Sequence, residues 1–119
     1  MPCVHNFGII ENLEDFNEDE FEPEKYNCIF IEDDFLGEIY HAGFKEKLDK
    51  LETYFHNLNR PNTSLAFYGT TLIPQTSLEY FLSITINENI KHNSKELEML
   101  IEKISTAIKE NKWMIHYGI

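Results

Sequence analysis

The sequence predicts a single α+β domain in which about three helices pack on a small mixed β-sheet. Apolar residues recur at helical spacing in two stretches, and short segments rich in β-branched and aromatic residues lie between them. At 119 residues the chain fits one domain, and 42% apolar residues, with 13% aromatic, suffice for a core without disulfides. These observations together favour helices and strands in alternation around one core.

In the first half, extended segments are expected at 2–10 and 26–32, because both are rich in aromatic and β-branched residues. Residues 35–41 fit either a short strand or a single helical turn. The first clear helix is predicted over 44–58, where apolar residues fall every three or four positions. Pro61 follows shortly after, and proline disfavours helix in the residue before it.

In the second half, residues 64–73 read as a buried strand. Thr76 and Glu79 have the spacing of a capping box and predict a short helix after Pro74. Residues 82–86 then alternate as a strand would, so the end of this element is left open.

A further helix is predicted to begin at Asn93 or Ser94, with its apolar stripe at Leu97, Leu100, Ile101, Ile104 and Ile108. A strand at 113–119 is expected to close the domain. The chain has no glycine-rich strand-to-helix turn, so a nucleotide-binding fold is not expected, and we predict no cofactor.

The net charge of −11 lies entirely in the first third of the chain. Residues 1–40 hold twelve Asp and Glu against one Lys, whereas residues 41–119 hold nine acids and nine bases. This asymmetry argues against binding to nucleic acid or to an anionic membrane, since both would repel it. It favours a basic partner, a cation, or a role in solubility alone.

Within this region we define residues 11–38 as the acidic segment. Its first part, ENLEDFNEDEFEPEK at 11–25, holds eight carboxylates but also Leu13, Phe16 and Phe21, which a solvated tail would not need. These apolar residues either anchor the segment on the core or serve as contacts for a partner, and we weigh both equally. The candidate partner-binding residues are Glu14, Asp15, Phe16, Glu18, Asp19, Glu20, Phe21, Glu22, Glu32, Asp33 and Asp34.

Calcium binding is an alternative, because Asp15, Asn17 and Asp19 match the first three ligand positions of an EF-hand loop. The match then fails, since position six needs glycine and has Glu20, and position twelve needs a bidentate Glu and has Tyr26. Chance spacing in an acidic run explains it better.

A zinc site is a weaker alternative, since only one close pair of possible ligands occurs. The residues in question are Cys3, His5, Cys28 and His41. We therefore expect no metal.

Catalysis is the main alternative to a binding role. A pocket near Tyr68, Gly69, Thr70 and Thr71, with His56 or His116 as the acid–base group, would suit a small enzyme or ligand-binding domain. Neither histidine has a nucleophile partner that the sequence reveals, and turn chemistry explains the 68–71 stretch better than a ligand site does. We expect no enzyme activity.

Cys3 and Cys28 are too few for a disulfide framework, so we expect them to be reduced, although a bridge between them stays possible. Burial in an apolar strand would make the Cys28 thiol inert. The chain shows neither a signal peptide nor an apolar run long enough to span a bilayer, so we expect a cytoplasmic protein.

In size, one-sided acidity from Glu11 to Glu38 and an α+β pattern without catalytic motifs, the chain resembles immunity proteins of bacterial polymorphic and contact-dependent toxins. The stretch YFHNLNRPNTSLAFYGTTLIP and the ending WMIHYGI have the look of such families. The resemblance is to the class, and no residue role carries over from it. It implies a cytoplasmic, non-enzymatic inhibitor that binds a basic toxin domain, for example a nuclease, and covers its active site.

Overall fold

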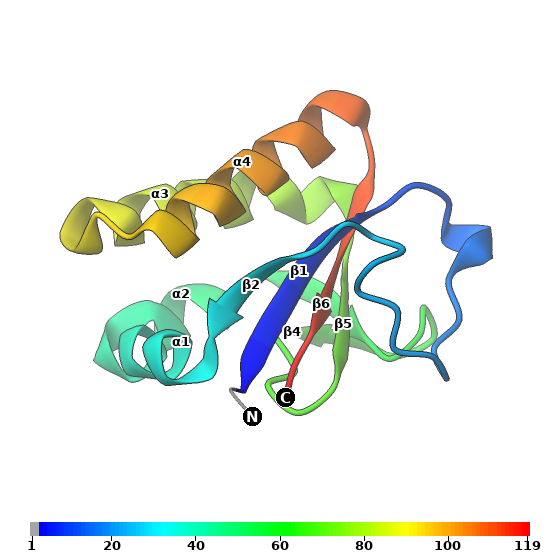
Figure 1. The fold of residues 1–119 in the computed structure, drawn as a ribbon, viewed down its shortest axis with the longest axis horizontal. Helices are drawn as coiled ribbons and strands as arrows, with labels where there is room; N and C mark the ends of the chain where they lie inside the picture. The colour runs from blue at the N-terminus through cyan, green and yellow to red at the C-terminus, as the bar shows by residue number, and fades with distance from the viewer. Residues whose placement is uncertain (1–2) are drawn as a thin grey trace.

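The computed structural model describes residues 3–119 and contains one six-stranded sheet (Figure 1). The strand order is β2-β1-β6-β5-β3-β4, and every neighbouring pair is antiparallel. The strands are β1 (Val4–Ile10), β2 (Ile29–Glu32), β3 (Glu52–Phe55), β4 (Pro61–Thr63), β5 (Thr70–Ile73) and β6 (Trp113–Tyr117).

Three helical segments accompany the sheet. A π-helical turn at Tyr40–Phe44 joins the first two helices into one bent segment, in which Gly43 has a φ of 130° that residues with a Cβ rarely adopt. The other two segments are long helices connected by a short turn. The helices are α1 (Asp33–Ile39), α2 (Lys45–Leu48), α3 (Leu78–His92) and α4 (Lys95–Glu110).

The predicted α+β class, with three helical segments packed on one sheet in a single domain, is confirmed. The sheet is antiparallel rather than mixed, and the α3–α4 pair explains the difference. The chain leaves β5 at Ile73 and returns at Trp113, and Ile73 pairs with Met114 at that end of the sheet. Two helices bring the chain back to the end it left, whereas a single crossover helix would have made β6 parallel to β5.

The helix predicted over 44–58 is wrong in both bounds. The helical segment begins at Asp33 and ends at Leu48, and residues 52–55 form β3. The apolar spacing misled because Phe44, Leu48 and Leu51 do share one core, but the following residues, Thr53 to Phe55, prefer a strand. Of the two alternatives for 35–41, the helical one is correct.

The strand considered at 82–86 is also wrong, because α3 continues through it. Its buried residues fall at helical spacing, and they are Leu78, Phe81, Ile84, Thr85 and Glu88. The expected capping box does not form at this helix. Its N-cap is Ser77, whose hydroxyl donates to the Glu52 carbonyl at 2.7 Å instead.

The remaining elements agree with the prediction to within a few residues. Strands at 4–10, 29–32 and 113–117 lie inside the predicted segments, and α4 begins directly after its N-cap Ser94. The predicted 64–73 strand shortens to β5, because residues 64–69 form a loop.

The two faces of the sheet are covered differently. α1, α3 and α4 cover one face, and their side chains enclose a large core with Phe7 of β1 and Met114 of β6. The opposite face is covered by residues 11–28 of the acidic segment, which lie to the right of the sheet in Figure 1. We call these the helix face and the loop face.

Candidate functional site

The acidic segment is anchored on the loop face by apolar side chains. Tyr26 is buried there with Ile10, Ile115 and Leu72. These three residues lie on the adjacent strands β1, β6 and β5, and their side chains are on the loop face. At the outer edge of this small core lie Leu13 and Phe16, both partly buried. Of the two roles considered for Leu13, Phe16 and Phe21, anchoring on the core therefore applies to Leu13 and Phe16, and Tyr26 is a further anchor.

Close backbone contact holds the end of the segment in place. A Cβ added to Gly8 of β1 would lie 2.6 Å from the Tyr26 carbonyl oxygen and 2.6 Å from the Cys28 Sγ. The Ile9 amide donates to the same Tyr26 carbonyl at 3.3 Å. Only glycine allows the segment to approach the sheet this closely.

Tyr117 of β6 fixes the middle of the segment. Its hydroxyl accepts a hydrogen bond from the Glu22 amide at 3.3 Å and donates to the Glu20 carbonyl at 3.4 Å. The Phe21 ring lies edge-on to the Tyr117 ring at 4.8 Å between centroids, yet Phe21 is 65% exposed. Phe21 is therefore ordered against the sheet and still available to a partner.

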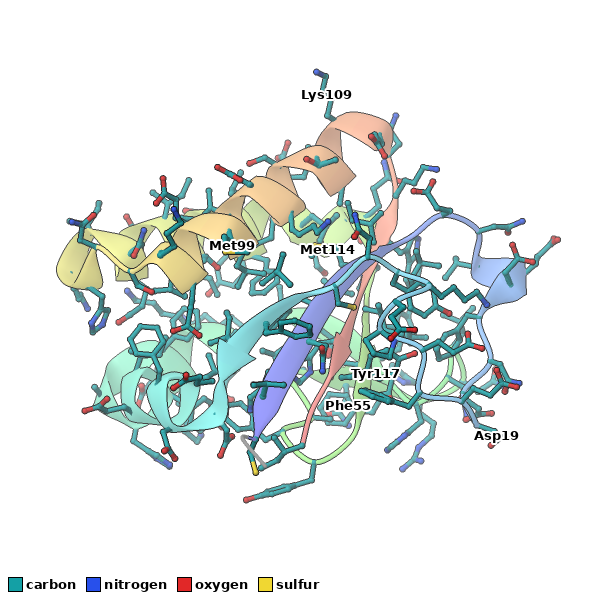
Figure 2. All side chains as sticks on the ribbon, viewed as in Figure 1. Asp19, Phe55, Met99, Lys109, Met114 and Tyr117 are labelled. Atoms are coloured by element: carbon teal, nitrogen blue, oxygen red, sulfur yellow. The ribbon has the colours of Figure 1, made fainter. Side chains whose placement is uncertain are left out.

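The carboxylates of residues 11–25 point away from the sheet. All of them are exposed except Glu22, which is partly buried, and Figure 2 shows Asp19 at the outer edge of the molecule. Two lysines compensate part of the charge: Lys25 pairs with Glu22 at 3.2 Å, and Lys112 pairs with Glu11. Within residues 3–119, no ion pair engages Glu14, Asp15, Glu18, Asp19, Glu20 or Glu24.

Two neighbouring carboxylates interact directly. A hydrogen bond to Glu22 raises the pKa of Glu20, and the same contact, together with Lys25, lowers the pKa of Glu22. Two like charges in such proximity destabilise each other unless a proton or a cation lies between them. An incoming lysine or arginine would relieve this repulsion.

A shallow cavity opens beside these residues. It has a volume of about 210 Å³, and its walls come from the acidic segment on one side and from the ends of β5 and β6 on the other. The lining residues are Glu18, Asp19, Glu20, Phe21, Gly69, Thr70, Tyr117 and Gly118. Three carboxylates and two aromatic rings around one cavity suit a basic side chain.

The last three candidate partner-binding residues, Glu32, Asp33 and Asp34, form a second acidic cluster away from residues 14–22. Glu32 ends β2, and Asp33 and Asp34 open α1, whose apolar side packs on the helix face. The Glu32 amide donates to the Glu96 carboxylate at 2.8 Å, and the Asp33 carboxylate binds a buried histidine. Figure 1 shows α1 and the 11–25 stretch on opposite sides of the sheet. The structure therefore does not bring the two clusters together.

A chain of four polar side chains crosses the helix face of the sheet. Thr71 Oγ1 lies 3.2 Å from His116 Nδ1, His116 Nε2 lies 2.8 Å from His5 Nδ1, and His5 Nε2 lies 2.7 Å from Asp33 Oδ1. The Ala66 amide donates to Thr71 Oγ1 at 2.8 Å. Thr71, His116 and His5 lie on β5, β6 and β1, which are neighbours in the sheet.

The hydrogen-bond directions of this chain follow from its ends. An ionised Asp33 only accepts, so His5 donates from Nε2 and accepts at Nδ1. His116 then donates from Nε2 and accepts at Nδ1 from the Thr71 hydroxyl. With both imidazoles neutral, every hydrogen bond of the chain is satisfied.

Burial keeps both imidazoles neutral near pH 7. It lowers the pKa of His116 well below its usual range, and the neighbouring His5 adds to this effect. Burial also lowers the pKa of His5, although the Asp33 carboxylate acts in the opposite direction. His5, His116 and Thr71 are fully buried, and only Asp33 is partly exposed.

This arrangement bears on the catalytic alternative. The order hydroxyl, imidazole, carboxylate is that of an activated nucleophile, but no substrate can reach a Thr71 oxygen that is fully buried. His56 packs against Gly69, and Tyr68 is 84% exposed. The 210 Å³ cavity includes Gly69 and Thr70 and neither histidine.

The two cysteines are not joined. Cys3 is exposed, and Cys28 is partly buried against Gly8, where burial raises the pKa of its thiol to about 12. The expectation of reduced cysteines and of an inert Cys28 agrees with this geometry.

Neither the calcium nor the zinc alternative has a set of ligands in the part of the chain that the structure describes. Across residues 3–119, no three carboxylate, imidazole or thiol side chains lie where they could hold one ion. The Asn17 side chain accepts from the Asp19 amide at 3.0 Å, which forms a local turn. In the zinc set, His5 is bonded to Asp33 and His116 instead.

Sequence reasoning missed the buried histidine chain, because His5 and His116 are 111 positions apart. Only the pairing of the two terminal strands places them together, and no local pattern predicts that pairing. It also missed Gly8 and Tyr117, which position the acidic segment. None of the helices within 3–119 has the length and apolar character needed to cross a bilayer.

Comparisons of the chain with protein-family models, with curated proteins and with solved structures found no match.

Proposed function

We propose that this protein is a non-enzymatic binding module that holds a basic protein partner on its acidic segment. The observation that carries the proposal is the arrangement of residues 11–25, in which apolar side chains face the sheet and exposed carboxylates face outward. The partner class that fits best is a basic toxin domain, for example a nuclease, which the protein would inhibit as an immunity protein does.

Charge complementarity alone would raise the association rate of the complex more than its affinity. Carboxylates at the rim of an interface contribute little affinity each, but they raise association rates to about 10⁸–10⁹ M⁻¹s⁻¹ at low salt. Affinity needs buried anchors, which are most often aromatic. Phe21, ordered against Tyr117 and 65% exposed, is suited to this role.

The segment is ordered before the partner arrives. Gly8 and Tyr117 fix its backbone, so binding would not have to order a disordered loop. The like charges it carries would repel each other in the free protein and lose that repulsion in a complex with a basic surface. These two features favour a preformed interface over a role in solubility alone.

A polyanion is an unsuitable partner for this surface, since nucleic acid and anionic membranes would meet six exposed carboxylates that have no internal ion pair. We therefore propose a protein partner in the cytoplasm. The catalytic alternative ranks second, because Thr71, His5 and His116, whose side chains are arranged as in an activated nucleophile, are fully buried under the helix face.

Gene neighbourhood and capture from the native host would supply the partner. We expect a secreted toxin encoded next to this chain, and its toxic domain should co-purify with the wild-type protein. Identification of that domain then allows the decisive comparison of variants.

The test variant reverses three charges, Glu18→Lys, Asp19→Lys and Glu20→Lys. The matched control, Glu46→Lys, Glu98→Lys and Glu102→Lys, changes the net charge by the same amount on exposed helix positions outside the acidic segment. We expect the first variant to lose protection against the toxin domain and the control to keep it, with both folded by circular dichroism. Equal protection by both variants would overturn the proposal.

A further inference from the structure

A second feature of the loop face is a groove beside the acidic segment. It has a volume of about 570 Å³, within the ~300–1,000 Å³ range of ligand sites, and it lies between the β3–β4 hairpin, the end of β5 and the start of β6. Leu13 and Phe16 of the acidic segment pack in the same small core as Tyr54 and Trp113, which line the groove. The groove and the acidic segment are thus anchored on the same small core.

One wall of the groove is aromatic. The Tyr54 and Trp113 rings are 5.7 Å apart between centroids and inclined by 28°, so they lie nearly parallel and offset. Pro61 and Pro74 also line the groove. A wall of this kind offers π faces and rigid apolar contacts, and its trough is open at the edge strand β4.

The one charged residue that lines the groove, among those the structure describes, is acidic. Glu52 lies on the same side of β3 as Tyr54, two residues away, and its side chain is exposed and has no ion pair among residues 3–119. A carboxylate beside aromatic faces attracts a planar cation, which can stack on the rings and hydrogen-bond to the oxygens together.

We propose that this groove binds an arginine side chain from an extended basic segment of the partner. The inference rests on the proposed function, and it adds the chemistry of one contact. Guanidinium fits better than ammonium, because it is planar, weakly hydrated and able to form two parallel hydrogen bonds to Glu52. The adjacent carboxylates of the acidic segment would attract the rest of the same basic segment.

Two basic residues of the chain itself stand near the groove. Lys112 precedes Trp113 and is held by Glu11. Arg60 precedes Pro61, is exposed, and is the only arginine of the chain. Its positive charge, one residue from the groove-lining Pro61, would repel a cationic ligand, so its removal should strengthen binding of an external arginine.

The single tryptophan of the chain makes the test direct, because the intrinsic fluorescence of Trp113 reports on the groove alone. The probe is the peptide acetyl-Gly-Arg-Gly-amide, and its control is the same peptide with citrulline, which has the shape of arginine without the charge. We expect a saturable fluorescence change with the arginine peptide and binding about fivefold weaker or worse with citrulline.

Variants locate the effect. Glu52→Gln and Tyr54→Leu should each weaken binding of the arginine peptide by about fivefold, Arg60→Gln should strengthen it, and Glu98→Gln should leave it unchanged. Far-ultraviolet circular dichroism confirms folding in each case. An unchanged Trp113 signal up to ~10 mM peptide, or equal binding of both peptides, would overturn the inference.

The outcome separates this inference from the proposed function. If the peptide fails while charge reversal at 18–20 abolishes protection, the groove inference is wrong and the binding function stands. If the peptide binds while charge reversal has no effect, the groove is an arginine site and the acidic segment is not the interface.

Discussion

The helix face and the loop face of the sheet are closed by different kinds of structure. On the helix face, eighteen buried apolar residues form one core under regular helices. On the loop face, five buried residues lie under an irregular segment that carries most of the excess charge. The comparison indicates that the helix face supplies most of the stability, because burial of apolar area is the main favourable term in folding.

This division explains how the chain tolerates its acidic segment. Like charges at close range lower stability, and many of them on the loop face would unfold a protein whose stability depended on that face. Here the segment needs only a few anchors, chiefly Tyr26, Phe16 and the Tyr117 hydroxyl. The loop face can therefore carry this charged surface without loss of the fold.

The largest difference is expected between Phe7→Ala and Phe16→Ala. Phe7 is fully buried on the helix face, with the Phe81 ring at 6.2 Å, so its truncation should cost about 3–5 kcal/mol of unfolding free energy. Phe16 is only partly buried on the loop face and should cost about 1 kcal/mol. Urea unfolding of both variants measures this, and equal losses would contradict the division between the faces.

The histidine chain predicts that acid destabilises the helix face first. Burial lowers the folded-state pKa values of His5 and His116, so the unfolded chain binds more protons as the pH falls below about 6.5. Stability should be fully present above that pH and fall below it, by at most about 1.4 kcal/mol per pH unit for each histidine.

Urea unfolding between pH 7.5 and 5 checks this prediction. His116→Gln should reduce stability at pH 7.5 and flatten the loss at lower pH, whereas His41→Gln, at an exposed position, should leave the slope unchanged. An unchanged slope in His116→Gln would show that the histidine chain is not the acid-sensitive element.

A glycine pair compares the two faces at the backbone. In Gly8→Ala the new methyl group would meet Tyr26 and Cys28, so we expect a loss of about 1–3 kcal/mol and a displaced acidic segment. Gly37→Ala has no atom within 4 Å and lies in α1, so it should stabilise by about 0.5–1 kcal/mol.

Trypsin distinguishes displacement of the segment from global unfolding, because Lys25 is the only basic residue in 1–40. Cleavage after Lys25 should be faster in Gly8→Ala than in Gly37→Ala under native conditions. Equal cleavage rates would mean that close approach at Gly8 does not hold the segment.

The smallest effect is expected from Tyr117→Phe. The variant keeps the ring that packs on Phe21 and removes two long hydrogen bonds to the segment, at 3.3 and 3.4 Å. We expect a loss of at most about 1 kcal/mol, with modestly faster cleavage after Lys25 and an unchanged far-ultraviolet spectrum. A loss as large as that of Phe7→Ala would show that the loop face is essential to the fold.

The same two faces differ in how well the sequence predicts them. α4 was predictable because its stripe is regular and Ser94 caps it through a hydrogen bond to the Leu97 amide. Anchoring of residues 11–28 was one of two roles that the sequence left open for Leu13 and Phe16, because an apolar residue among carboxylates suits a buried anchor and a partner contact alike. The helix over 33–48 was misplaced, because Phe44, Leu48 and Leu51 face one core although a turn separates the last of them from the helix.

Long-range pairing limits prediction of the candidate site. The position of Asp33 in the histidine chain, away from the acids at 14–22, depends on which strands are neighbours in the sheet. The groove likewise joins Tyr54 to Trp113, which only the β3-β5-β6 order brings together. Side-chain periodicity describes one element at a time and does not encode this order.

The most direct measurement of the central claim is the association rate constant of the cognate basic domain, followed by stopped flow at low and high salt. The account predicts that charge reversal at Glu18, Asp19 and Glu20 lowers the low-salt rate by at least about tenfold. The matched control at Glu46, Glu98 and Glu102 should change it far less, and screening should bring all rates together at high salt. Equal low-salt rates for the two variants would contradict the claim that the acidic segment is the binding surface.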